Sequence, residues 1–197
     1  MKSAIPALAL ALFASLAGAS PASAADKVRV VNEGGIRDEW TLAPGAKLAA
    51  PGYPAAFANR GENVCMAIGY RINPDGSTGE YALLKAWSSS MGESEPVDGY
   101  WDAFSQSSVA ALQGWRFAPK PDVDKPRAVD TVATMTFMGK NPEDGAVLRS
   151  KCKIDDLAAY LEQVRVDMAK RGDLNRKQLE RSYMQQTRTE MIRTPRS

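Results

Sequence analysis

The sequence predicts an α+β domain in which a small antiparallel sheet of β-β-α-β order packs against one helix and is followed by a helical extension. Three observations lead to this prediction. Apolar residues alternate along residues 63–72, a strong turn follows at residues 73–76, and apolar residues recur at helical spacing along residues 100–113. A period of two is typical of a strand with one buried face, whereas a spacing of three to four is typical of an amphipathic helix.

The first 24 residues have the pattern of a cleavable signal peptide. A positive charge precedes the apolar residues 5–19, and the small residues Ala22 and Ala24 suit cleavage before Ala25. An uncleaved anchor is the alternative, but the apolar run is shorter than the ~20 residues that a transmembrane helix needs. We therefore expect export to the periplasm and no stable membrane span.

An N-terminal segment over residues 25–50 precedes the domain core. It contains a short alternating strand at residues 28–31, after which turns rich in glycine and proline interrupt regular structure. The core domain is expected over residues 51–139. It begins near Tyr53-Pro54, where proline restricts the backbone.

A long β-hairpin is the next predicted element. In residues 63–72 the larger apolar side chains share one face of the strand, so this face is expected to be buried. The sequence Asn-Pro-Asp-Gly at residues 73–76 predicts a tight turn, because proline presets φ and Asp-Gly accepts positive φ values. The second strand is expected over residues 80–88.

A helix and a third strand complete the predicted core. The helix covers residues 100–113, and Gly114 suits its C-terminal end. Trp115 and Phe117 follow, and we expect them to be core aromatics that close the helix against the sheet, with a recognition patch as the alternative. Residues 129–138 are rich in Val and Thr, which predicts the third strand.

Residues 140–197 form the predicted helical extension. Apolar residues recur at helical spacing over residues 154–168, so a helix is expected there. A weaker apolar stripe at residues 174–192 is consistent with another helix. The tail beyond Arg171 is rich in arginine, and we expect a solvated helix there, with contact to anionic lipid as the alternative.

The two cysteines, Cys65 and Cys152, are expected to pair because export places them in an oxidising compartment. Two free thiols, one buried and one exposed, are the alternative. A bridge would close a loop long enough to stabilise the fold by about 4–5 kcal/mol on the chain-entropy model. Their separation excludes a Cys-x-x-Cys redox motif.

The composition restricts the chemistry. The chain has no histidine, which excludes Ser-His-Asp and Cys-His catalysis and removes the commonest zinc ligand. A net charge of +2 gives no basis for nucleic-acid binding. The serines at residues 88–90 lack an imidazole to activate them. We expect neither an enzyme nor a cofactor or metal; a hydrolase built on paired carboxylates, with Asp75 and Glu80 as the residues to test, is the remaining catalytic alternative.

Five short motifs occur in a fixed order within residues 51–139. They are Tyr53-Pro54, Gly61 followed by Val64, Ile72 followed by Asp75-Gly76, Ser88-Ser89, and Trp115-Arg116-Phe117-Ala118-Pro119. Their order and spacing resemble the C-terminal domain of TonB-family energy transducers. The resemblance covers less than half of the chain.

This resemblance implies a small sheet that binds an extended peptide, the Ton box of outer-membrane transporters, by adding a strand to an exposed sheet edge. The matching edge is the strand over residues 129–138, with Tyr53 and Pro54 as a second contact. Three polar side chains predict that this edge is half-exposed. The implied partner-binding residues of the strand are Thr131, Val132, Ala133, Thr134, Met135, Thr136 and Phe137, of which the three threonines are the polar ones.

The chain departs from this family: its leader has a cleavage pattern, and a long spacer is missing before residue 51. The segment after Gly61 also starts sooner after Tyr53-Pro54 than is usual, and the helical extension after Cys152 has no place in the family core. We therefore expect a peptide-binding module without energy coupling. A scaffold that forms a homodimer through the same strands is the alternative. Capping of residues 129–138 by another part of the chain, such as the C-terminal extension, would exclude strand addition.

Overall fold

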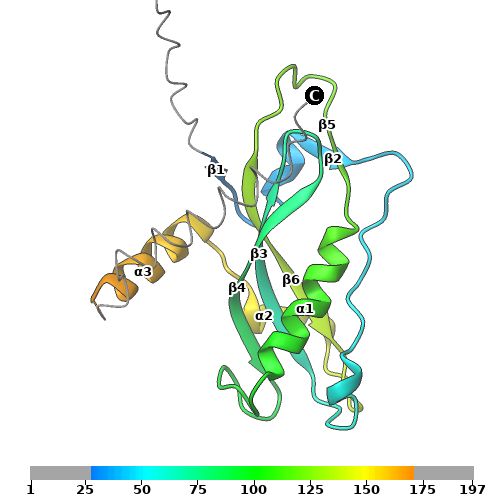
Figure 1. Ribbon diagram of the computed structural model, residues 1–197, viewed down its shortest axis with the longest axis vertical. Coiled ribbons are helices and arrows are strands. Elements are labelled where there is room, and N and C mark those ends of the chain that lie inside the picture. Colours follow the sequence, from blue (N-terminus) through cyan, green and yellow to red (C-terminus); the bar gives the residue numbers. More distant parts are fainter. Residues whose placement is uncertain (1–27, 171–197) are drawn as a thin grey trace, which may run out of the picture.

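The computed structural model describes residues 28–170 and has the α+β architecture expected from the sequence (Figure 1). The signal peptide, the helix at residues 174–192 and the basic tail are predictions that lie outside the described residues. In chain order the elements are β1 (Arg29–Val30), η1 (Gly35–Asp38), β2 (Trp40–Leu42), η2 (Ala55–Phe57), β3 (Val64–Ile72), β4 (Thr78–Ser88), α1 (Tyr100–Gln113), β5 (Phe117–Pro119), β6 (Val129–Phe137), α2 (Gly145–Cys152) and α3 (Leu157–Lys170).

Four strands form the main sheet in the order β1-β6-β3-β4. β3 pairs antiparallel with β4 and with β6, which confirms the predicted hairpin and third strand. The two-residue β1 joins the sheet by pairing in parallel with the start of β6. A second sheet, made of β2 and β5, has no counterpart in the sequence prediction.

The hairpin turn depends on Gly76. Its φ of 78° lies in the left-handed region, and its N–H donates to the Asn73 carbonyl at 2.8 Å. The Gly76 carbonyl in turn accepts the Phe117 N–H at 2.9 Å, which brings β5 against the turn. A Cβ atom at Gly76 would lie 1.9 Å from the Phe117 carbonyl oxygen. Both the backbone conformation and the close approach of a second chain segment therefore require glycine.

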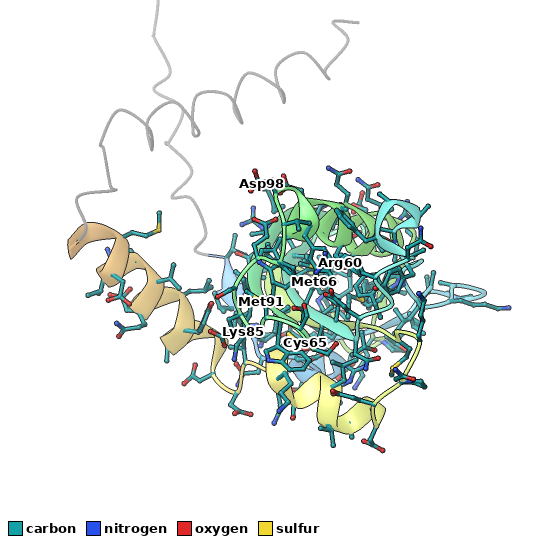
Figure 2. All side chains as sticks on the ribbon, turned by 90° about the horizontal axis from the view of Figure 1, so that it is seen from below. Arg60, Cys65, Met66, Lys85, Met91 and Asp98 are labelled. Atoms are coloured by element: carbon teal, nitrogen blue, oxygen red, sulfur yellow. A yellow bond between two sulfur atoms is a disulfide. The ribbon has the colours of Figure 1, made fainter. Side chains whose placement is uncertain are left out.

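The sheet is covered on both faces, with α1 on one side and α2 on the other (Figure 2). The sequence pattern predicts one buried face for β3, but residues of both faces are buried, and only Gly69 and Arg71 on the second face are partly exposed. Met66 and Ile68 belong to the core beneath α1, whereas Cys65 and Ala67 belong to a second core beneath α2. The prediction fails here because small side chains on the second face leave room for a helix to pack closely.

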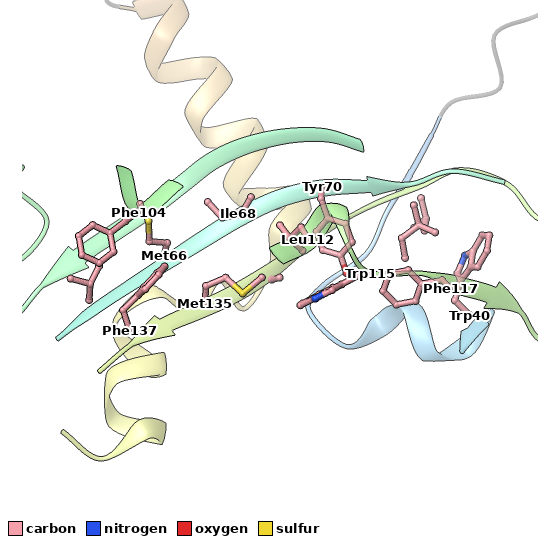
Figure 3. Close-up of a cluster of buried hydrophobic side chains, with 14 of the residues drawn as sticks. Trp40, Met66, Ile68, Tyr70, Phe104, Leu112, Trp115, Phe117, Met135 and Phe137 are labelled. Carbon is pink, nitrogen blue, oxygen red and sulfur yellow. The ribbon is translucent and has the colours of Figure 1, made fainter. Parts of the chain in front are cut away.

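The core beneath α1 is built largely from aromatic side chains (Figure 3). Phe104 of α1 meets Phe137 of β6 with ring centroids 4.8 Å apart. Trp115 and Phe117 are 9% and 6% exposed and both pack near Tyr70, which confirms their prediction as core aromatics. Burial of these large rings accounts for much of the hydrophobic stabilisation of the fold.

A disulfide joins Cys65 of β3 to Cys152 at the end of α2, as predicted, with Cα atoms 5.9 Å apart. The helix α2 lies within the predicted helical extension but is itself missed by the sequence prediction, which expects helices only at residues 154–168 and 174–192. Asp144 begins this helix: its carboxylate accepts the N–H groups of Ala146 and Val147. The apolar stripe of α2 is weak, and the helix is stabilised by the Asp144 N-cap and by the disulfide.

The helix α3 starts on the body of the domain and then extends away from it (Figure 1). Leu157 in its first turn is 1% exposed, whereas Val164 and Met168 are 37% and 43% exposed. The predicted helix at residues 154–168 is thus confirmed from Leu157 onward, while Ile154 packs in the core beneath α2. Within residues 28–170, no helix combines the length and apolar character that crossing a membrane requires.

The two glycines Gly76 and Gly45 provide a matched test of the hairpin turn. Their φ values are 78° and 76°, but nothing lies within 4 Å of a Cβ at Gly45. We expect Gly45→Ala to lower the free energy of unfolding by about 1 kcal/mol, the cost of a left-handed alanine. Gly76→Ala adds a backbone clash and should lower it by about 3 kcal/mol or more. Equal losses in urea denaturation would show that Phe117 does not constrain the turn.

Candidate functional site

The strand predicted to bind a partner is β6, and one of its two edges is occupied along its whole length by pairing within the sheet. Every residue from Val129 to Phe137 pairs with β3. Any further strand must therefore join on the opposite side of β6.

The opposite side of β6 faces the N-terminal segment, residues 28–34. The Val31 N–H donates to the Asp130 carbonyl at 2.9 Å, and the Thr134 N–H donates to the Glu33 carboxylate at 2.9 Å. Hydrogen-bonding groups alternate sides along a strand, so the even-numbered residues of β6 direct their N–H and C=O groups away from β3.

The cap formed by the N-terminal segment is partial. β1 pairs with only the first two residues of β6, Val129 and Asp130. Beyond them the backbone is met by a side chain, that of Glu33, rather than by a strand. The edge at residues 132–136 therefore lies outside the β1 pairing, and the segment that caps the start of β6 is N-terminal, not the C-terminal extension.

The expectation that the threonines make this edge half-exposed is wrong for two of them. Thr131 is 2% exposed and Thr134 is 3% exposed; Thr136 is half-buried. Thr131 Oγ1 donates to the Asn32 carbonyl at 3.3 Å, and Thr134 Oγ1 donates to the Glu33 carboxylate at 2.7 Å. These hydroxyls are buried because the N-terminal segment supplies them with acceptors.

A groove of about 370 Å³ runs beside residues 132–136 of β6. Aromatic side chains from the core form its floor, the N-terminal segment forms its walls, and α2 contributes one cation. Its lining comprises Glu33, Gly34, Ile36, Leu48, Ala49, Ala50, Pro51, Tyr70, Trp115, Phe117, Val132, Ala133, Thr134, Met135, Thr136 and Arg149. The five binding residues predicted at 132–136 thus lie together along one groove, whereas Thr131 and Phe137 lie beyond its two ends.

Trp115 holds the far wall of this groove in place. Its indole N–H donates to the Ala49 carbonyl at 3.0 Å, while its ring packs at 6.0 Å from that of Tyr70. On this wall Leu48 is 51% exposed. The groove therefore combines a fixed aromatic floor with an accessible aliphatic side chain at its rim, the composition typical of peptide- and ligand-binding clefts.

Glu33 closes one side of the groove with a charged contact. Its Oε1 accepts the Thr134 N–H at 2.9 Å and pairs with the Arg149 guanidinium at 3.2 Å, and its Oε2 accepts the Thr134 hydroxyl at 2.7 Å. Neither Glu33 nor Arg149 is among the residues predicted from the sequence. No sequence signal connects them, because they are 116 residues apart and neither belongs to a recognisable motif.

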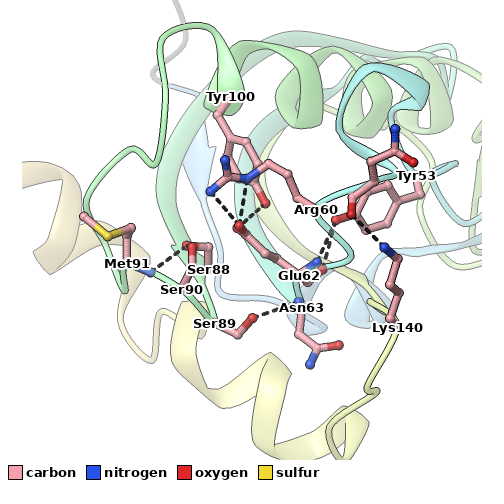
Figure 4. A network of polar contacts seen from close by, with 11 residues as sticks. Tyr53, Arg60, Glu62, Asn63, Ser88, Ser89, Ser90, Met91, Tyr100 and Lys140 are labelled. Atoms are coloured by element: carbon pink, nitrogen blue, oxygen red, sulfur yellow. Dashed lines mark hydrogen bonds and ion pairs between the residues drawn. The ribbon is translucent and has the colours of Figure 1, made fainter.

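The predicted contact residues Tyr53 and Pro54 do not line this groove. Tyr53 instead packs against Phe104, with centroids 5.1 Å apart, and its hydroxyl both donates to the Glu62 carbonyl and accepts the Glu62 N–H (Figure 4). Burial raises the pKa of Tyr53, so its phenol stays neutral and able to donate. Pro54 precedes η2. Tyr53 therefore supports the fold, and neither residue lines the groove.

The other edge of the sheet, β4, is less regular. Its pairing with β3 has two register shifts, and Glu80 has a φ of 52°. The Tyr160 hydroxyl of α3 donates to the Leu84 carbonyl within this interrupted stretch. Bulges of this kind protect an edge from pairing. Between the two edges, β6 therefore presents the more regular backbone.

The serines considered as nucleophiles have structural partners (Figure 4). Ser88 Oγ accepts the Met91 N–H at 3.2 Å, and Ser89 Oγ accepts the Asn63 N–H at 3.1 Å. Over residues 28–170, no three acidic, cysteine or histidine side chains gather in a way that suits a metal ion. The groove beside β6 is the candidate site that follows from the sheet geometry.

No protein-family model matches this chain, and no curated protein matches it. Among solved structures, one similar chain is described as the solution NMR structure of the Pseudomonas aeruginosa TonB CTD. The likeness covers 53% of this chain and 90% of that one, at 18% sequence identity and a TM-score of 0.40. So distant a likeness carries no functional conclusion.

Removing the Tyr53 hydroxyl tests whether this residue supports the fold. Tyr53→Phe keeps the ring contacts with Phe104 but leaves both backbone groups of Glu62 without this partner. We expect the free energy of unfolding to fall by about 1 kcal/mol. Urea denaturation measures the change, and an unchanged midpoint would contradict the structural function given to Tyr53.

Proposed function

We propose that this protein is a periplasmic binding module that takes up extended peptide segments of envelope or outer-membrane transport proteins at the β6 edge. The peptide would add a strand beside residues 132–136, without energy coupling and without catalysis. The observation that carries the proposal is the groove that runs along these residues on the side of β6 not used by β3.

Backbone complementarity supports strand addition. The even-numbered residues of β6 direct their hydrogen-bonding groups toward the groove, and Thr134 already donates its N–H to an oxygen on that side. A peptide strand would supply carbonyl and N–H groups in the same direction. Main-chain hydrogen bonds of this kind provide affinity for any extended sequence, and side-chain pockets provide selectivity.

The dimensions of the groove favour a short segment. Five residues of extended chain span about 17 Å. Alternate side chains of such a strand would face Trp115, Tyr70 and Phe117 on the floor, and the others would face away from the core. We therefore expect peptides with apolar residues at every second position to bind best.

Two features support the periplasmic location. The first 24 residues have the pattern of a signal peptide, and the disulfide between Cys65 and Cys152 is of the kind that persists in oxidising compartments. The absence of histidine from the sequence supports a binding function rather than acid–base catalysis at neutral pH. Ton-box-like segments are the first peptides to test because of the ordered sequence motifs within residues 51–139.

Calorimetric titration of the chain from Ala25 onward with Ton-box-like peptides tests this proposal. We expect saturable binding that is lost when alternate peptide nitrogens on the side facing β6 are methylated. Methylation of the intervening nitrogens should leave binding unchanged, because those groups do not face the edge. Binding that depends on neither set would exclude strand addition.

Two exposed aliphatic residues, one inside the groove and one outside it, provide a matched test of the binding site. Leu48 on the groove wall and Val147 on α2, outside the groove, are 51% and 50% exposed. Leu48→Asp should weaken peptide binding about tenfold by placing a charge at an apolar contact. Val147→Asp should leave it unchanged. Equal effects of the two changes would exclude the groove as the binding site. Dimers in sedimentation that dissociate on Leu48→Asp, without any peptide binding, would favour the scaffold alternative.

A further inference from the structure

We propose that the seat now occupied by the Glu33 carboxylate is a carboxylate-binding subsite of the groove, which accepts a carboxylate of the incoming peptide in place of Glu33. This inference rests on the proposed function and specifies the class of peptide. The carboxylate could belong to an acidic side chain or to the C-terminus of the peptide.

Three donors converge on this seat from two elements. The N–H and hydroxyl of Thr134 come from β6, at 2.9 and 2.7 Å from the two Glu33 oxygens, and the Arg149 guanidinium comes from α2 at 3.2 Å. Hydrogen bonds to an ionised carboxylate are stronger than those between neutral groups. The set matches the two oxygens and single charge of a carboxylate more closely than a lone peptide carbonyl.

The backbone that carries the donors is fixed in the fold independently of Glu33. Thr134 pairs with Ala67 of β3, so its N–H direction is set by the sheet. Arg149 lies on α2, which is anchored by the fully buried Leu148 and by the disulfide at Cys152. Thr134 and the helix that carries Arg149 would therefore keep their places when the carboxylate is exchanged, a condition for preorganised binding.

Glu33 is attached to the fold in a way that allows exchange. The next residue, Gly34, has a φ of 81° and open space around it. The Glu33 side chain is 29% exposed, and that of Arg149 is 52% exposed. Residues 28–31 remain held by β1 pairing when the side chain swings out. The exchange therefore involves one side chain rather than the whole N-terminal segment.

Displacing Glu33 has a cost that only some peptides can offset. Thr134 is 3% exposed, so its N–H and hydroxyl are shielded from water and need an acceptor. A peptide carbonyl satisfies the N–H but leaves the hydroxyl and the Arg149 charge without an anionic partner. A peptide with a carboxylate at this position replaces all three contacts. The subsite therefore selects acidic peptides over their amide counterparts.

Paired peptides test this selectivity and identify the source of the carboxylate. Ton-box-like peptides are synthesised with Glu or Gln at each groove position in turn, and separately with a free C-terminal acid or a C-terminal amide. We expect one acid to bind about tenfold or more tightly than its amide partner, as for a charge-assisted hydrogen bond. The pair that shows this difference tells whether a side chain or the C-terminus occupies the seat.

Protein variants test whether the preference for the acid over the amide peptide arises at this seat. Arg149→Gln should reduce the acid-over-amide preference to about twofold or less, whereas Arg165→Gln on the exposed part of α3 should retain it. Glu33→Gln should tighten binding of the acidic peptide, because a neutral side chain competes less well for Arg149. Circular dichroism and disulfide content check that each variant is folded.

The outcomes separate this inference from the proposed function. Peptides that bind with equal affinity as acid and amide, with no change in Arg149→Gln, would overturn the carboxylate subsite and leave strand addition intact. Failure of every peptide to bind folded protein would overturn both. An acid preference that persists in Arg149→Gln would place the carboxylate elsewhere and would also overturn this inference.

Discussion

The fold depends on the enclosure of β3. This strand pairs along both of its edges, with β4 and β6; one of its faces is buried throughout, and the other is buried at Cys65 and Ala67. The larger side chains on one face require α1 and the aromatic cluster, while the smaller ones on the other allow α2 to approach closely enough for the Cys65–Cys152 bond. With β3 enclosed, β6 has a single edge left for other partners. The pairing of β6 with β3 also fixes the side to which this edge faces.

The N-terminal segment determines what remains available at that edge. Its strand β1 uses two residues of β6, and Glu33 then contacts Thr134 through a side chain. An unpaired sheet edge is a risk for aggregation, and a charged side chain that covers it is a common protection. In this protein the charged side chain that covers the edge, Glu33, lies beside an apolar groove and an arginine. The contact between Glu33 and Thr134 would therefore both protect the edge and take part in selective binding.

Local patterns in the sequence are sufficient to predict the helices and strands that depend on residues close together in the chain. The alternation before residue 73, the Asn-Pro-Asp-Gly turn and the stripe of α1 each predict an observed element. The helix α2 escapes detection because its stability comes from Asp144 and the disulfide rather than from a strong apolar stripe. The place of Glu33 beside Thr134 arises from a contact between residues 101 positions apart, and the burial of Thr134 follows from it. Such contacts depend on the assembled sheet and leave no periodic pattern in the chain.

Amide hydrogen exchange with bound peptide is the sharpest test of strand addition, because it reports on β6 residue by residue. Strand addition predicts slower exchange at Val132 and Thr136, whose N–H groups face the groove. The amides of Ala133 and Met135 should exchange as before, since they already bond to β3. Slowing confined to β4, or no change along β6 in a saturated complex, would contradict the account.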